Sequence, residues 1–428
     1  MDKFIQSDEK ENAENSQEDS GSIVLSDDGP QCFSQKELND LVRDLCLTKD
    51  GAELLGSRLK EKKVLASGVT FSWYRHREKE FAAFYSAEDN VVYCKDIPGL
   101  MRQHALQYEP SQWRLFMDSS QSSLKAVLLH NGNHFASLPV AYSSNMKENY
   151  TNLAVILLKI RYADNAWMIC GDFKVISMLL GQQLGYIKYP CFLCMWDSRA
   201  RHLHWNKTIW PLRQNLTVGE SNIINVALVP REKVLLPPLH IKLGLMKQFC
   251  KSLCKDGECW KVLCSKFPKL SDAKLKEGIF IGPQIRKLLT DSLFLQSMND
   301  KEKEAWESFR DVVHNFLGNR KAKNYKEIVN RMLTAFQAQG CNMSLKVHFL
   351  HSHVDYFPEN LGAYSEEQGE KFHQDIMTME RRYQGRMDVN MMADYSWMLK
   401  RENRFTAKRK RNRRSIKDTK NLYKPQML

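Results

Sequence analysis

The chain has 428 residues and a formal net charge of +13, with 43% hydrophobic and 10% aromatic residues. This length allows two or three domains, and the composition is typical of a globular protein. No apolar run reaches the roughly 18 residues of a membrane span, and the N-terminus lacks the apolar stretch of a signal peptide. Eleven cysteines in irregular spacing favour a reducing compartment. We therefore expect a nuclear or cytosolic protein with no membrane segment.

Charge is distributed unevenly along the chain. Residues 1–30 hold nine acidic residues against two lysines, or −7, and residues 401–428 hold eleven basic residues against two acids, or +9. The remaining body therefore carries 13 + 7 − 9 = +11. A basic body and tail favour a phosphate-rich partner such as DNA. The tail also resembles a nuclear localisation signal, formed by Lys408, Arg409, Lys410, Arg411, Arg413 and Arg414.

Ordered structure is expected to begin at Ser34, where Ser-Gln-Lys-Glu predicts a capping box closed by Glu37. A turn at Lys49-Asp50-Gly51 leads into a second predicted helix over 52–62. The pair could form either a DNA-binding helix-turn-helix or a plain helical hairpin.

Residues 112–172 predict three strands, a helix and a fourth strand. The strands are QWRLFMD, LKAVLLH, HFASLPVAYS and AWMICGD, with a tight hairpin at Asn131-Gly132 and a helix over 147–162. This β-β-β-α-β order is that of the ribonuclease H-like fold, an α/β core in which the first and fourth strands are neighbours. Asp118 and Asp172 end those two strands.

The long stretch between Asp172 and Glu370 is mostly helical in pattern, which predicts an α-helical insertion interrupting the core. The expected organisation is an acidic disordered tail (1–30), a helical or mixed region (31–110), the first part of the core (111–190), a zinc-linked helical insertion (191–347), the second part of the core (348–400) and a basic tail (401–428).

Three carboxylates are candidates for binding two divalent cations. Such pairs of Mg²⁺ or Mn²⁺, roughly 3.5–4 Å apart, serve phosphoryl transfer. Asp118 and Asp172 are two of the ligands, and Glu370 is preferred as the third, with Glu366 and Glu367 as alternatives. Ser365 is expected to cap their helix, which places Glu366, Glu370 and His373 on one face and Glu367 on another.

A C-x-x-C pair and an H-x-x-x-x-H pair predict one structural zinc site. Cys191 follows Asp172 by 19 residues, and His353 precedes Glu370 by 17. Zinc bound by Cys191, Cys194, His348 and His353 would join the start of the insertion to its end. The sequence leaves open four alternative histidines, which are His202, His204, His240 and His351.

From about residue 34 to 400, the chain resembles a group of transposon-derived proteins abundant in arthropod genomes. The motifs are WRLFMDSSQSSLKAVLLHNGN, GDFKVISMLLGQQLGYIKYPCFLCMWDSRA and HFLHSHVDYFPENLGAYSEEQGEKFHQDI. The order of acids and zinc ligands is similar to that of DDE transposases with an RNase H-like core, particularly the Transib elements and the related antigen-receptor recombinase.

This resemblance implies Mg²⁺-dependent DNA cleavage and strand transfer, with Asp118, Asp172 and Glu370 as metal ligands and zinc on the Cys₂His₂ set. It implies DNA as the partner and a nuclear location, and a homodimer is a compatible assembly. The alternative is a catalytically inactive, transposon-derived protein that binds DNA or chromatin and keeps the zinc.

Overall fold

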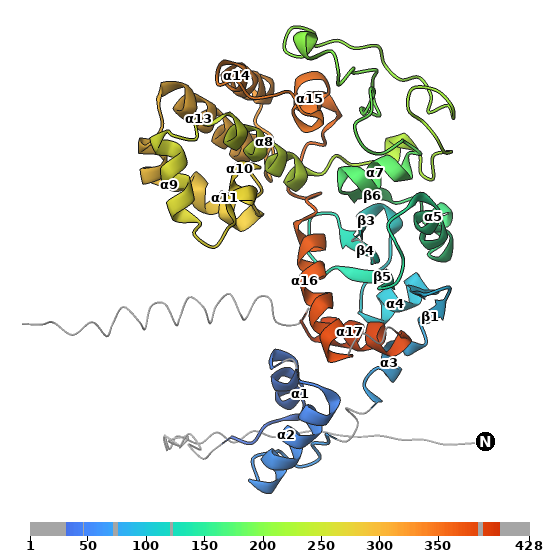
Figure 1. Cartoon of the computed structure of the whole chain (residues 1–428). Coiled ribbons are helices and arrows are strands. Elements are labelled where there is room, and N and C mark those ends of the chain that lie inside the picture. The colour runs from blue at the N-terminus through green and yellow to red at the C-terminus, as the bar shows by residue number, and fades with distance from the viewer. Residues whose placement is uncertain (1–30, 46, 72–75, 120–122, 384–387, 403–428) are drawn as a thin grey trace, which may run out of the picture. The chain divides into compact units, whose positions relative to one another are not determined.

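The computed structural model describes residues 31–45, 47–71, 76–119, 123–383 and 388–402 (Figure 1). The predicted acidic tail over 1–30 and the basic cluster over 408–414 lie outside these residues. The chain divides into two compact units, Met1–Tyr74 and Arg75–Leu428. In the described part, no helix is both long and apolar enough to cross a membrane.

The described part of the first unit contains two helices, α1 (Gln35–Asp44) and α2 (Lys49–Glu61). The Ser34 capping box is confirmed, because Ser34 and Glu37 bond each other's backbone N–H groups. The predicted turn at 49–51 is wrong. Thr48 accepts a hydrogen bond from Gly51 N at 3.1 Å and so starts α2 at Lys49.

The second unit is a mixed α/β structure built on one sheet. Its described strands are β1 (Tyr85–Glu88), β2 (Val91–Cys94), β3 (Trp113–Ser119), β4 (Leu124–His130), β5 (Leu138–Ser143) and β6 (Met168–Gly171). Their order is β1-β2-β5-β4-β3-β6. All neighbours are antiparallel except β3 and β6, which run parallel with Met117 opposite Gly171. The four strands predicted over 112–172 are therefore present, and the β1–β2 hairpin extends the sheet beyond them.

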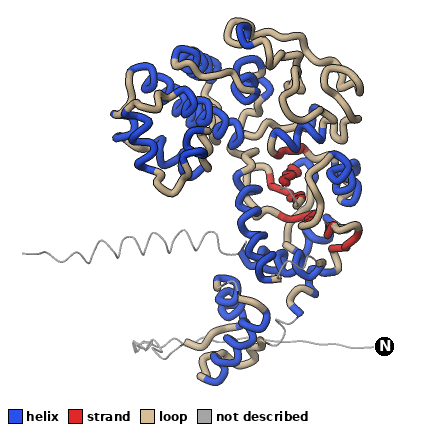
Figure 2. Tube along the Cα trace, viewed as in Figure 1, coloured by secondary structure: helices blue, strands red, loops and turns tan. Residues whose placement is uncertain are grey.

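Helices lie on both sides of this sheet (Figures 1 and 2). Those that contact the strands are α5 (Tyr150–Lys159), α7 (Phe173–Leu179), α16 (Glu367–Arg382) and α17 (Val389–Glu402). The same unit contains α3 (Lys79–Ala82), α4 (Ile97–Gln103), α6 (Tyr162–Asn165) and a 3₁₀ turn at Pro110–Gln112. Strand β4 is buried along its whole length, which agrees with its apolar sequence. α16 approaches closely because Gly369 faces Phe116, where a Cβ would lie only 2.3 Å from the ring.

The turn predicted at Asn131-Gly132 forms, with Asn133 N donating to the His130 carbonyl at 2.9 Å, but it is only the first part of a longer hairpin between β4 and β5. Its connection spans 131–137, and it is held by residues from far along the chain. The buried Arg114 guanidinium donates to Asn133 Oδ1 at 2.8 Å and to the Ser365 carbonyl at 2.7 Å. Asn133 in turn donates to the Gly362 carbonyl at 2.8 Å. These bonds hold Asn133, the residue that directly follows the turn, against residues 362–365.

The segment between the two parts of the sheet region is helical only in its second half. Its helices are α8 (Pro238–Ser252), α9 (Glu258–Lys266), α10 (Asp272–Lys276), α11 (Gly282–Leu289), α12 (Ser292–Gln296), α13 (Asp300–Asn315), α14 (Tyr325–Ala338) and α15 (Leu345–Ser352). A 3₁₀ turn at Val354–Tyr356 follows.

Residues 180–237 were expected to share this helical character, but in the structure they form mainly turns and loops. They contain only the 3₁₀ turns Arg201–Leu203 and Arg231–Lys233. Buried Arg213 organises this stretch by donating to the backbone carbonyls of Cys191, Tyr189 and Ser221 at 2.8–2.9 Å. One buried side chain therefore satisfies three of the backbone carbonyls in this stretch.

Candidate metal centre and neighbouring carboxylates

The structure brings the four predicted cysteine and histidine ligands together. Cys191 and Cys194 come from the irregular stretch before α8, His348 lies on α15, and His353 directly follows that helix. Cys194 Sγ lies 3.3 Å from His348 Nε2 and 3.2 Å from His353 Nε2. Cys191 Sγ lies 3.6 Å from His353 Nε2, and the four ligand atoms all lie within 4.8 Å of one another. We call this set the Cys₂His₂ group, and it could hold a metal ion.

The chemistry of the donors fits a metal ion. Hydrogen bonding from Cys191, and then from His348 and His353, lowers the pKa of the Cys194 thiol to about 3, which favours a thiolate. Burial lowers the pKa of His348, which favours the neutral imidazole that a metal needs. Burial raises the pKa of Cys191 well above its ordinary value, which favours the protonated thiol in the absence of a metal. Binding of a metal ion would displace that proton, because the thiolate is the ligand.

The other histidines considered as ligands lie outside the Cys₂His₂ group. His204 Nε2 is 2.8 Å from the Asp197 carbonyl, and His351 packs edge-on against Trp205. His240 contacts Glu366, and His202 is exposed. Trp196 stacks on the His348 ring with centroids 4.6 Å apart, so an aromatic side chain covers the group.

Asp118 and Asp172 lie at the same edge of the sheet. Because Met117 pairs with Gly171 in the parallel β3–β6 ladder, the next residue on each strand is an aspartate. Gly171 is needed there, since a Cβ would lie 2.6 Å from the Met117 carbonyl. Asp172 also caps α7, where its Oδ1 accepts from Val175 N at 2.7 Å.

The three glutamates before and within α16 have different surroundings. Glu366 is fully buried, and its Oε1 accepts from His240 N at 2.9 Å and lies 3.0 Å from His240 Nδ1. Glu367 is exposed and pairs with Lys242 and Arg286, each at 3.2 Å. Burial, and then the negative charge of Asp118, raises the pKa of Glu370.

The helix of these glutamates begins one residue later than predicted. Glu366 takes the N-cap position, and the helix starts at Glu367. The Ser365 hydroxyl still accepts from Glu367 N, at 3.3 Å. The expectation that Glu367 points away from Glu366 is confirmed by their opposite exposure.

Two side chains that were not predicted as site residues lie beside Asp118. His373 contacts Asp118 directly, and Lys125 contacts His373. Asp118 Oδ2 lies 2.9 Å from His373 Nδ1, and Lys125 Nζ lies 2.6 Å from the same nitrogen. These contacts compete, because Nδ1 donates to the carboxylate only when protonated and accepts from the ammonium only when not. Lys125 is the one charged residue in the apolar sequence LKAVLLH, and it pairs with Asp118 across β3 and β4. That signal was present in the sequence.

The three predicted carboxylates are not gathered as tightly as the Cys₂His₂ group. Among the described residues, that group is the one set of three or more His, Cys, Asp or Glu side chains with mutually close ligand atoms. Asp118, Asp172 and Glu370 therefore share a region of the structure without forming a closed set.

Two family models match the chain, and neither carries a functional description. Residues 73–229 match a domain of unknown function, DUF8703, and residues 238–318 match a second one, DUF8704. The first match covers the sheet and both cysteines of the Cys₂His₂ group. The second covers α8–α13 and ends before His348 and His353, the two histidines of that group. No curated protein matches the sequence.

Proposed function

We propose that this chain is a DDE-type DNA transposase, or a domesticated derivative of one, with an RNase H-like core. The observation that carries the proposal is the pairing of Met117 with Gly171, because it makes Asp118 and Asp172 neighbours at one edge of the sheet. The β5-β4-β3-β6 order, with only β3 and β6 parallel, supports the same core. A parallel bridge from Ile169 to Val234 on the far side of β6 is where a fifth strand of such a core would lie.

In this proposal Asp118, Asp172 and Glu370 would hold Mg²⁺ or Mn²⁺. When bound, the cations would supply Lewis-acid stabilisation of the attacking and leaving oxygens of a phosphodiester. Glu370 is the preferred third ligand, because Glu367 faces outward and Glu366 is occupied by His240. The raised pKa of Glu370 next to Asp118 is typical of carboxylates that share a cation site.

The metal of the Cys₂His₂ group is proposed to be a structural zinc. Two sulfur and two imidazole ligands are a common tetrahedral zinc set, and all four positions are filled by protein. This zinc would tie residues 191–194, which precede the helical segment, to α15 at the end of that segment. We further propose DNA as the partner and the nucleus as the location, on the basis of the basic body and tail.

The test is cleavage of plasmid DNA by the purified chain in Mg²⁺ or Mn²⁺. Asp118→Asn and Asp172→Asn should each reduce nicking at least 100-fold, because each removes a negative ligand while preserving side-chain shape. Asp164→Asn is the matched control, since Asp164 is exposed on α6, and it should retain full activity. Cleavage that survives both site changes would refute the catalytic proposal.

A second candidate function is DNA binding without catalysis. It is favoured by the existing contacts of the acids, since His373 contacts Asp118 and α7 uses Asp172 as its cap. This alternative predicts DNA binding that is equal in the wild-type chain and both aspartate variants, with no cleavage in any of them.

A further inference from the structure

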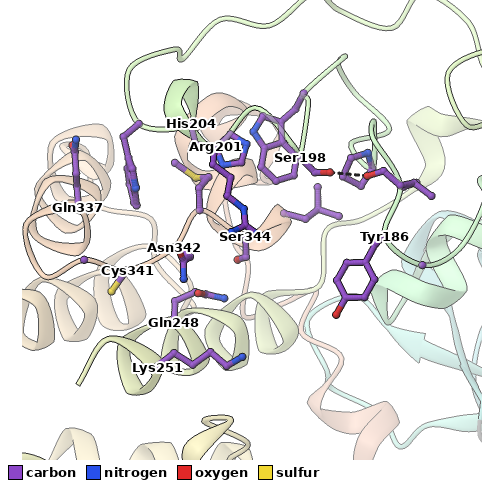
Figure 3. Close-up of a pocket in the computed structure, with 18 residues that line it drawn as sticks. Tyr186, Ser198, Arg201, His204, Gln248, Lys251, Gln337, Cys341, Asn342 and Ser344 are labelled. Carbon is purple, nitrogen blue, oxygen red and sulfur yellow. Dashed lines mark hydrogen bonds between the residues drawn. The ribbon is translucent and has the colours of Figure 1, made fainter. Parts of the chain in front are cut away.

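A pocket of about 780 Å³ lies beside the Cys₂His₂ group, away from the carboxylates. We call it the α8–α14 pocket, and three segments line it (Figure 3). They are the irregular stretch 185–205, residues Gln248 and Lys251 of α8, and residues 337–345 from the end of α14 to the start of α15. Its volume lies within the range of small-ligand sites, about 300–1,000 Å³.

The charged groups of the pocket favour an anion. Arg201 and Lys251 line it, and no Asp or Glu does. Arg201 is exposed and makes no ion pair with any residue in the described ranges, whereas Lys251 also pairs with Glu277 at 2.8 Å. Arginine offers a planar set of donors that suits phosphate oxygens. Figure 3 shows Arg201 reaching toward Asn342 and Ser344, with Gln248 and Lys251 on the opposite side.

The uncharged side chains favour a flat heterocycle attached to that anion. Tyr186 and Trp205 provide exposed or half-buried aromatic rings for stacking. The amides of Gln248, Gln337 and Asn342 each offer both donors and an acceptor, which is what the mixed edge of a nucleobase requires.

One wall of the pocket is continuous with the metal group. Trp196 lines the pocket and lies between two histidine rings, stacked on His348 at 4.6 Å and tilted toward His204 at 4.9 Å. Its indole N–H is buried and has no hydrogen-bond partner among the described residues. His348 of the Cys₂His₂ group therefore packs against Trp196, a pocket residue whose indole N–H makes no hydrogen bond within the described part of the chain.

We propose that the α8–α14 pocket binds an unpaired nucleotide, with its phosphate on Arg201 and Lys251 and its base against Tyr186 or Trp205. The nucleotide could be free or part of a single strand, since both present the same base and phosphate. This inference goes beyond the proposed cleavage activity and does not depend on it.

Calorimetric titration of the full chain with adenosine monophosphate, a single-stranded hexanucleotide and a blunt duplex tests the proposal. We expect saturable binding of the hexanucleotide. Binding of the monophosphate as well would show that the free nucleotide suffices, and its absence would show that the strand is required. Adenosine and ribose 5-phosphate, which each lack one half of the nucleotide, should bind at least 10-fold more weakly than whichever ligand binds. Equal binding of ribose 5-phosphate would overturn the proposal, as would binding of the duplex alone or of nothing.

Arg201→Ala should weaken binding at least 10-fold, because a bond to a charged group is lost. Tyr186→Ala should weaken it about 5-fold or more if the base stacks there, and otherwise Trp205→Ala should do so. Arg201 and Tyr186 are exposed, so their truncation leaves the core intact. Arg199→Ala removes the same charge from an exposed position outside the pocket lining and should change affinity less than twofold. An equal loss of nucleotide affinity in Arg199→Ala and Arg201→Ala would show that only the net charge of the chain matters, and would overturn the proposed site.

The outcome is separable from that of the proposed function. Asp118→Asn should leave nucleotide affinity unchanged, because Asp118 does not line the pocket. A chain that binds the nucleotide but never cleaves DNA would refute only the catalytic proposal.

Discussion

Replacing Cys194 by serine should remove the metal and greatly destabilise the second unit. Cys194 Sγ is the sulfur closest to both histidines, at 3.3 Å and 3.2 Å. A metal that joins Cys194 to His348 closes a loop with a sequence separation of 154 residues. Treated as a cross-link of the unfolded chain, a loop of that length contributes about 5 kcal/mol to the free energy of unfolding. That is comparable to the whole stability of many domains, about 5–15 kcal/mol.

Metal content and thermal unfolding should be measured on the same preparations. The wild-type chain should carry one zinc per molecule, and Cys194→Ser should carry almost none. The melting temperature of the variant should be on the order of 10 °C lower than that of the wild-type chain. A chelator should lower the melting temperature of the wild-type chain to that of the variant.

Cys259→Ser is the matched control, because Cys259 is equally buried and lies outside the Cys₂His₂ group. It should lose some stability through its buried hydroxyl and keep its zinc. Full zinc content in Cys194→Ser, or a wild-type melting temperature unaffected by chelation, would refute the argument.

Three further predictions concern the rest of the second unit. Burial lowers the pKa of His104 to about 4, so its imidazole binds a proton more readily in the unfolded chain than in the folded one. The free energy of unfolding should therefore fall by up to about 3 kcal/mol between pH 6.5 and pH 4. His104→Phe should reduce this pH dependence, as measured by urea unfolding at several pH values. Arg77 donates to buried Asp394 at 2.8 Å, so Arg77→Met should cost about 3 kcal/mol in urea unfolding, and an unchanged midpoint would contradict a structural role for the pair. Gly369→Ala should cost about 1–3 kcal/mol because its Cβ meets Phe116, and a second change, Phe116→Leu, should recover part of that loss.

The sequence was most informative where hydrophobic pattern alone determines structure. Strands β3, β4 and β6 are short apolar runs, and burial on both faces leaves such runs few alternatives. The Cys₂His₂ group was also predictable, although each pair is weak alone, because the cysteine pair follows Asp172 and the histidine pair precedes the glutamates.

Features that depend on distant side chains were not predictable from local pattern. The contact between Asp118 and His373 joins residues 255 positions apart and requires the placement of α16. In the irregular stretch 180–237, Arg213 donates to the carbonyls of Cys191, Tyr189 and Ser221, contacts that no periodicity reveals. The β4–β5 connection likewise depends on a buried arginine that reaches Ser365.

The bond from Arg114 to Ser365 has a consequence for synthesis of the chain. The two residues are 251 positions apart, which at about 5–20 residues per second corresponds to roughly 10–50 s of translation. For most of that interval β3, β4 and β5 have been synthesised, while Gly362, Ser365 and α16 do not yet exist. The sheet face that α16 later covers therefore has no α16 against it on the nascent chain for about 10 s or more.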